Sequence, residues 1–212
     1  MTGQKVKPKL RGVSHYLAFF VALAAGGYLL AIAPDHAWFP VLIYVISLVW
    51  LLGVSALYHR PMWSLEMRAR LRRLDHASIF ILIAGTYTPF CLIALPPESG
   101  IPLLRAVWAS GIVGAVVIAI WTRRPRGLAA IIYVAVGLIA LFDIRALTQA
   151  LSPRAFACFL AGGVFYITGA VVYALRRPNP NPAVFGYHEV FHVLVVIACT
   201  FHFVAVAVTV VG

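Results

Sequence analysis

Four ionisable residues stand at the ends of long apolar segments, where charged groups are rare: His59, Asp75, His188 and His192. His188 and His192 are four residues apart, so one helix presents both on the same face, and Ser55 precedes His59 by one helical turn. An ionisable residue inside a membrane span is costly and is therefore a sign of function. A catalytic zinc site takes three protein ligands and one water. These residues predict a zinc site with His59, His188 and His192 as ligands.

The elements that must position these side chains are transmembrane helices. The chain has 212 residues, of which 63% are hydrophobic and only 11% are charged. Apolar stretches of about 20 residues, the length that crosses a bilayer core, recur along it. We predict an all-α membrane protein, a single seven-helix transmembrane domain over residues 1–212. Its helices are expected at residues 15–33, 40–59, 75–95, 103–122, 128–143, 156–175 and 188–211.

The positive charges predict how this bundle is oriented. Fourteen of the 17 Lys and Arg residues precede the first helix or lie between the second and third, the fourth and fifth, or the sixth and seventh. The positive-inside rule then places the N-terminus in the cytoplasm and the C-terminus outside. This distribution explains the net charge of +11 without nucleic acid, and we expect no nucleic-acid partner. The expected partners of the basic loops are anionic lipids of the inner leaflet.

This orientation brings the candidate ligands to one depth. His59 ends the second helix, Asp75 begins the third, and His188 and His192 lie in the first turns of the seventh. All four groups then fall within about two helical turns of the cytoplasmic leaflet. The segment from His188 to His192 also has the HExxH pattern of zinc metalloproteases, in which Glu189 would be the general base.

Other residues carry weaker signals. His76 follows the predicted site carboxylate but points about 100° away on an ideal helix, so a direct ligand role is not expected. His202 comes ten residues after the last predicted ligand and is interpreted as a histidine of the bundle interior. His15 and His36 are interpreted as interfacial. The arginine-rich stretch 60–73 fits either a short helix on the membrane surface or a solvated loop.

Three separate segments of the chain resemble the PAQR family, which groups progestin and adiponectin receptors with bacterial hemolysin III proteins. They are Ser55-Ala56-Leu57-Tyr58-His59, Leu74-Asp75-His76 and the run from His188 to Val196. The family belongs to the CREST superfamily of proposed membrane hydrolases, alongside the alkaline ceramidases. The size and short termini resemble the bacterial hemolysin III branch. This resemblance implies a multi-pass protein of the bacterial inner (plasma) membrane.

The resemblance also implies roles for individual residues. His59, His188 and His192 match the zinc-binding positions, and Asp75 matches the aspartate that holds the zinc-bound water. Ser55 matches the serine one turn before the first ligand, whereas Glu189 is not required by the family pattern.

The favoured function is a zinc-dependent hydrolase of an amide or ester bond in a lipid-like substrate, whose acyl chain enters the apolar bundle. Asp75 would orient the water or accept its proton, and Ser55 would help to stabilise charge on the substrate oxygen. Two alternatives stay open. One is a non-enzymatic membrane sensor, receptor or cytolytic pore-like protein with a structural zinc. The other is an intramembrane metalloprotease that uses the HExxH segment.

Overall fold

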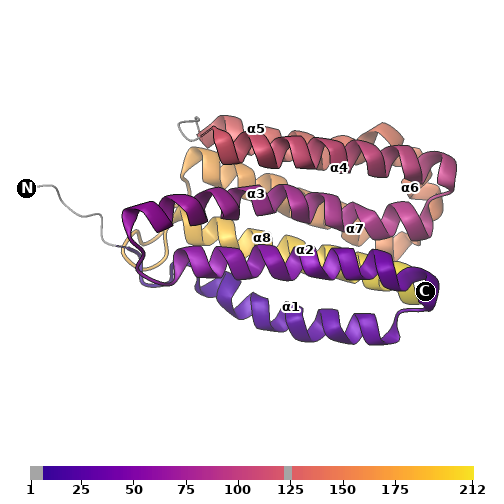
Figure 1. Cartoon of the computed structure of the whole chain (residues 1–212), viewed down its shortest axis with the longest axis horizontal. Helices are drawn as coiled ribbons and strands as arrows, with labels where there is room; N and C mark the ends of the chain where they lie inside the picture. Colours follow the sequence, from indigo (N-terminus) through magenta and orange to yellow (C-terminus); the bar gives the residue numbers. More distant parts are fainter. Residues whose placement is uncertain (1–6, 122–125) are drawn as a thin grey trace, which may run out of the picture.

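Long helices that run side by side make up the protein, as a computed structural model describing residues 7–121 and 126–212 shows (Figure 1). Within these ranges, seven helical segments are long and apolar enough to cross a membrane. The predicted seven-helix architecture is therefore confirmed. The first of these helices begins and the last one ends at opposite ends of the bundle (Figure 1).

The helices follow one another with short connections. Seven of the elements are α1 Val13–Ile32, α2 Asp35–His59, α3 Leu65–Pro89, α4 Pro97–Ile120, α5 Arg126–Gly137, α7 Pro153–Leu175 and α8 Tyr187–Val211. A π-helical turn, η1 Phe90–Ala94, extends α3, and the fifth span continues from α5 through a 3₁₀ turn, η2 Leu138–Asp143, into α6 Ile144–Ala150.

The third span begins ten residues before the predicted start at residue 75. Ser64 caps α3, because its hydroxyl accepts a hydrogen bond from the Met67 backbone N–H at 3.2 Å. Glu66 and Arg70, four residues apart, form an ion pair on the first turns of the helix. Most of the arginine-rich stretch is thus helical, so the loop interpretation was wrong beyond the short connection at 60–64, and the helix there is not a separate short one but the first part of α3. Asp75 lies about three turns inside α3.

The fifth span is longer than the predicted 128–143 and is not one continuous α-helix. It changes to the 3₁₀ turn η2 after Gly137 and resumes as α6, ending at Ala150. The Tyr87 hydroxyl of α3 donates a hydrogen bond to the Gly137 carbonyl and accepts one from the Ala140 N–H at 3.2 Å. Tyr87 therefore satisfies backbone groups that the change of helix type releases.

α8 occupies a central position, since it packs against α1, α2, α3 and α7. Its Val206, with no measurable exposure, joins a buried apolar cluster that includes Tyr44 of α2, Phe90 of η1 and Val107 of α4. The first turns of α8 are consequently enclosed by α1, α2 and α3, which is the geometry that lets residues of several helices meet.

We call the end of the bundle where α2 ends and α8 begins the histidine end. The cations at or near this end within the described ranges are Lys7, Lys9, Arg11, Arg60, Arg68, Arg70, Arg72, Arg73, Arg176 and Arg177. Arg105, Arg145 and Arg154 belong to the elements at the opposite end. The cations at 123, 124 and 126 that also entered the orientation prediction lie outside the residues whose side chains are described. That the histidine end faces the cytoplasm stays a prediction.

Candidate metal centre

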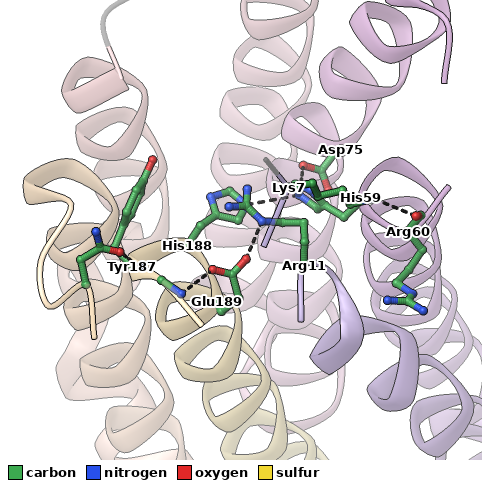
Figure 2. Close-up of polar contacts among 10 residues, drawn as sticks. Lys7, Arg11, His59, Arg60, Asp75, Tyr187, His188 and Glu189 are labelled. Carbon is green, nitrogen blue, oxygen red and sulfur yellow. Dashed lines mark hydrogen bonds and ion pairs between the residues drawn. The ribbon is translucent and has the colours of Figure 1, made fainter. Parts of the chain in front are cut away.

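Three of the predicted site residues meet at the histidine end. His59 is the last residue of α2, and His188 and His192 lie on one face of the first turns of α8. One ring nitrogen from each of the three lies within 4.8 Å of those of the other two. His59 and His192 are buried and His188 is half-buried. Figure 2 shows the side chains of His59 and His188 directed toward each other, and their ring planes are inclined by 67°.

The spacing of two of these rings fits a metal ion. The Nε2 atoms of His59 and His188 are 3.3 Å apart. A tetrahedral zinc with Zn–N bonds of about 2.0–2.1 Å separates two ligand nitrogens by about 3.3 Å. In addition, Nδ1 of His192 is buried without a hydrogen-bond partner among the described residues. An unsatisfied buried nitrogen is costly, and coordination of the ring is one way to compensate for it. The donor set therefore fits zinc.

Asp75 and Ser55 lie beside the cluster but differ from it in geometry. The Asp75 Oδ2 atom is 4.0 Å from Nε2 of His59, which is beyond hydrogen-bond distance. The Ser55 hydroxyl, one turn before His59, donates a hydrogen bond to the Asp75 carboxylate. Both side chains are buried. The structure thus brings together all five residues that the sequence singled out, with the carboxylate set back from the three nitrogens.

His15 was interpreted as interfacial from the sequence, and this was wrong. Only 3% of His15 is exposed, and its ring stacks on that of His192 with centroids 4.0 Å apart and planes inclined by 14°. Its position two residues after the start of α1 gave no local signal, because a contact between α1 and α8 depends on helix packing. The chain's first histidine therefore belongs to the surroundings of the cluster.

Glu189 does not face the cluster as a general base would. One of its oxygens is 2.5 Å from Nε of Arg11, and the other accepts a hydrogen bond from the Gly186 N–H at 2.8 Å (Figure 2). The second contact is one half of a capping box at the start of α8, since the N-cap residue Gly186 has no side chain to form the other half. Both carboxylate oxygens are therefore engaged, one by the Arg11 side chain and one by the backbone at the start of α8.

The remaining histidines lie outside the cluster. Nδ1 of His76 is 3.1 Å from the Tyr133 hydroxyl of α5. Nε2 of His202 donates a hydrogen bond to the Phe159 carbonyl at 3.1 Å, as expected for a histidine of the bundle interior. His36 is exposed near the opposite end of the bundle. None of these three belongs to the histidine cluster.

An elongated cavity of about 280 Å³ extends from the cluster into the bundle. At the histidine end, its lining includes Ser55, Asp75, His188 and His192. Deeper in, its walls come from α3, α5, η2, α7 and α8 and are predominantly apolar. Five apolar residues line the cavity and are also exposed on the outer surface of the bundle: Leu138, Leu141, Leu160, Val164 and Ile167. The cavity therefore opens sideways, between the fifth span and α7.

Comparison with known proteins gives the chain's relationships. Residues 3–203 match the family model described as "Haemolysin-III related". The chain belongs to the haemolysin-III-related family. The resemblance that the motifs around His59, Asp75 and His188 suggested is thereby confirmed.

Individual relatives of this haemolysin-III-related chain come from bacteria and an animal. It is 34% identical to Hemolysin-3 of Bacillus cereus over 58% of this chain and 53% of that protein. It is 28% identical to the Hemolysin-3 homolog of Bacillus subtilis over 78% of this chain and 79% of that protein. It is 26% identical to the Adiponectin receptor protein of Drosophila melanogaster over 76% of this chain and 40% of that protein. The matches thus span about half or less of two of these relatives.

Family membership and seven apolar spans together identify a multi-pass integral membrane protein. The likeness to two Bacillus proteins agrees with the expected location in the plasma membrane.

Proposed function

We propose that this protein is a zinc-dependent hydrolase that cleaves an amide or ester bond in a substrate with an acyl chain. The observation that carries the proposal is the 3.3 Å separation between Nε2 of His59 and Nε2 of His188, at the end of an apolar cavity. A site that binds metal and is continuous with an apolar cavity is suited to a reaction at the polar end of a lipid.

Each residue of the site would have its own role in hydrolysis. His59, His188 and His192 would hold zinc, which when bound supplies Lewis-acid polarisation of a carbonyl and acidifies water. Asp75 would accept a proton from the attacking water and deliver it to the leaving nitrogen or oxygen. The hydroxyl of that water would go to the acyl carbon as the amide or ester bond breaks. Ser55 would hold the Asp75 carboxylate in position through its hydrogen bond.

The cavity supports a lipid-like substrate. Its lateral opening is lined by apolar side chains that would face the acyl chains of the membrane. A substrate dissolved in the bilayer would enter through this opening without crossing water, with its scissile bond reaching Asp75 and its chain lying along α3, α7 and α8. The loops of the histidine end are basic and would attract anionic lipid headgroups.

The contacts of Glu189 speak against an intramembrane metalloprotease. In the HExxH proteases the glutamate acts on the attacking water. Here both oxygens of Glu189 are occupied, one by Arg11 and one by the Gly186 N–H. Asp75, which lines the cavity, is the better placed base.

The test is a metal measurement paired with an activity measurement on purified protein in lipid nanodiscs. We expect about one zinc per chain. Hydrolysis of a panel of ceramides, other N-acyl amides and acyl esters should stop on treatment with a chelator and return with added zinc. Bound zinc without hydrolysis of any member of the panel would favour a structural zinc in a sensor, receptor or pore-like protein. Absence of zinc would contradict the proposal itself.

A further inference from the structure

The segment of residues 7–15, which we call the N-terminal strap, crosses the histidine end and is tied to two loops. The backbone N–H groups of Lys9 and Leu10 donate hydrogen bonds to the carbonyls of Ala183 and Val184, each at 3.1 Å. These carbonyls belong to the connection between α7 and α8. The Lys7 ammonium donates a hydrogen bond to the Arg60 carbonyl at 2.7 Å, after the end of α2.

The strap therefore joins the two helices that carry the histidine cluster. Figure 2 shows Lys7 and Arg11 between these helices. Partial burial and the nearby charges of Arg60, Arg68 and Arg11 lower the pKa of Lys7 from its usual 10.5. Its bond to a carbonyl offsets part of this penalty.

Arg11 makes the first contact between the strap and the cluster. Its Nε is 2.5 Å from Glu189, whose side chain is only 2% exposed. Glu189 follows His188 directly and precedes His192 by three residues. Since its second oxygen holds the Gly186 N–H, this carboxylate links the strap to the first turn of α8. A shift of Arg11 would move the turn that carries two of the three histidines, or leave a buried charge without a partner.

Gly12 makes the second contact, with His59. Its φ of 76° lies in the left-handed region, where residues with a side chain are strained. A Cβ at this position would lie 2.6 Å from Cβ of His59. The strap backbone is thus packed directly against the base of this histidine, and the absence of a side chain at Gly12 permits that approach.

His15 makes the third contact, with His192, through the nearly parallel stacking of their rings. The side chain presents a flat packing surface to the His192 ring and also interacts with the His192 backbone. That surface limits rotation of the His192 ring about its χ angles.

We propose that Arg11, Gly12 and His15 are positioning residues of the metal centre, holding the histidines of α2 and α8 in the geometry that binds zinc. This inference rests on the proposed zinc site and deepens it. Residues that support and orient metal ligands typically change metal affinity by about 10–100-fold when they are replaced. The glutamate of the HExxH segment then has a structural role, because Glu189 anchors its own helix to the strap.

The experiment measures zinc affinity by competition with a chelator, using the full chain in nanodiscs. The double variant Arg11→Ala/Glu189→Gln removes the ion pair without burying an unpaired charge, and the new amide side chain keeps an acceptor for the Gly186 N–H. The exposed pair Arg70 and Glu66 provides a matched control, because its N–O distance is also 2.5 Å but it contacts no residue of the cluster. The control variant is Arg70→Ala/Glu66→Gln.

A second pair of variants tests His15 without touching any charge. His15→Ala removes the ring that packs on His192, whereas His15→Phe keeps a flat ring. We expect a loss of zinc affinity of about 10–100-fold for the Arg11/Glu189 double variant and for His15→Ala. Affinity should be unchanged in the Arg70/Glu66 variant and largely restored in His15→Phe.

Thermal unfolding with and without zinc separates positioning from general stabilisation. The stabilisation of the folded protein by zinc rises with the logarithm of the zinc affinity, so positioning variants should show a smaller rise in Tm on zinc addition. Folded variants with a lower Tm but wild-type zinc affinity would overturn the proposal. If the double variant does not fold, the zinc affinities of His15→Ala and His15→Phe test the proposal by themselves. A wild-type protein that binds no zinc would instead contradict the proposed function and, with it, the positioning role proposed for the strap.

Discussion

Asp75 stands back from His59, with its Oδ2 atom 4.0 Å from the Nε2 atom of that histidine. Two ligands of one tetrahedral zinc would be about 3.3 Å apart, and a hydrogen bond would be shorter still. The gap suits a water held between the carboxylate and the centre of the histidine cluster. The position of Asp75 therefore separates two roles, proton acceptor and metal ligand, that mutagenesis can distinguish.

Asp75→Asn should keep zinc and lose hydrolysis. Asn has the same shape and still accepts the Ser55 hydrogen bond, but it is a much weaker proton acceptor. Loss of a general base typically lowers the rate by about 10²–10⁴-fold. Zinc content and hydrolysis are measured on the same preparation, with Asp143→Asn in η2, away from the cavity, as the control. Full zinc together with normal hydrolysis, or normal complementation of a deletion strain, would sink the hydrolase proposal.

His192→Ala should remove most of the bound zinc. Two remaining histidines form a weak site, since a zinc centre in proteins normally has at least three protein ligands. Metal content after dialysis against a mild chelator is the measurement. His36→Ala, a replacement of an exposed histidine near the opposite end, should retain about one zinc per chain. A His192→Ala variant with full zinc occupancy would show that the ligand set is wrong.

Much of the fold and of the candidate site could be predicted from local sequence. The lengths of the apolar stretches predicted seven spans, and the ends of these spans placed His59 and His188 at one end of the bundle. The beginning of α3 was missed because hydropathy marks where a chain is apolar, whereas the Ser64 cap and the Glu66–Arg70 pair continue the helix through a charged stretch.

The strap was missed for a different reason. Arg11 looked like one of several positive charges before a membrane span, and only the packing of α1 against α8 brings it to Glu189. A contact between the first and the last helix of the chain leaves no periodic pattern in the sequence. The local signals were a glycine directly after a charged residue and a histidine three residues later, and neither points to a partner on its own.

The orientation of the bundle can be tested with reporter fusions. We expect a fusion in the connection between Arg60 and Ser64 to report the cytoplasm and a fusion at Gly212 to report the outside, because positive charge gathers at the histidine end. A fusion between Leu151 and Ser152 should agree with Gly212. Cytoplasmic signals at both ends of the chain would imply an even number of crossings and contradict the seven-span topology.

Gly12→Ala should destabilise the protein and weaken zinc binding. A side chain in the left-handed region costs about 1–3 kcal/mol, and here the new Cβ would also collide with the base of His59. Gly27 in α1 is the matched control, because a Cβ there meets nothing within 4 Å. Gly27→Ala should be neutral or stabilising by up to about 1 kcal/mol, since Ala favours the helix. Thermal unfolding and chelator competition are measured on both variants. Equal stability and equal zinc affinity in the two variants would mean that Gly12 has no special role.

Because the cavity opens laterally, a bulky residue on α7 should obstruct substrate entry at a position that lines the cavity but not at a neighbouring exposed position. Val164 and Val171 are both exposed on the bundle surface, but only Val164 lines the cavity. Val164→Trp should obstruct the path of an acyl chain while leaving the histidine cluster untouched, so zinc content stays normal. The substrate's KM should rise, or kcat/KM fall, more steeply for long acyl chains than for short ones. Val171→Trp adds the same ring to the same lipid-facing surface and should change neither quantity. Equal kinetics in the two variants would place the route of the substrate elsewhere, through the loops of the histidine end.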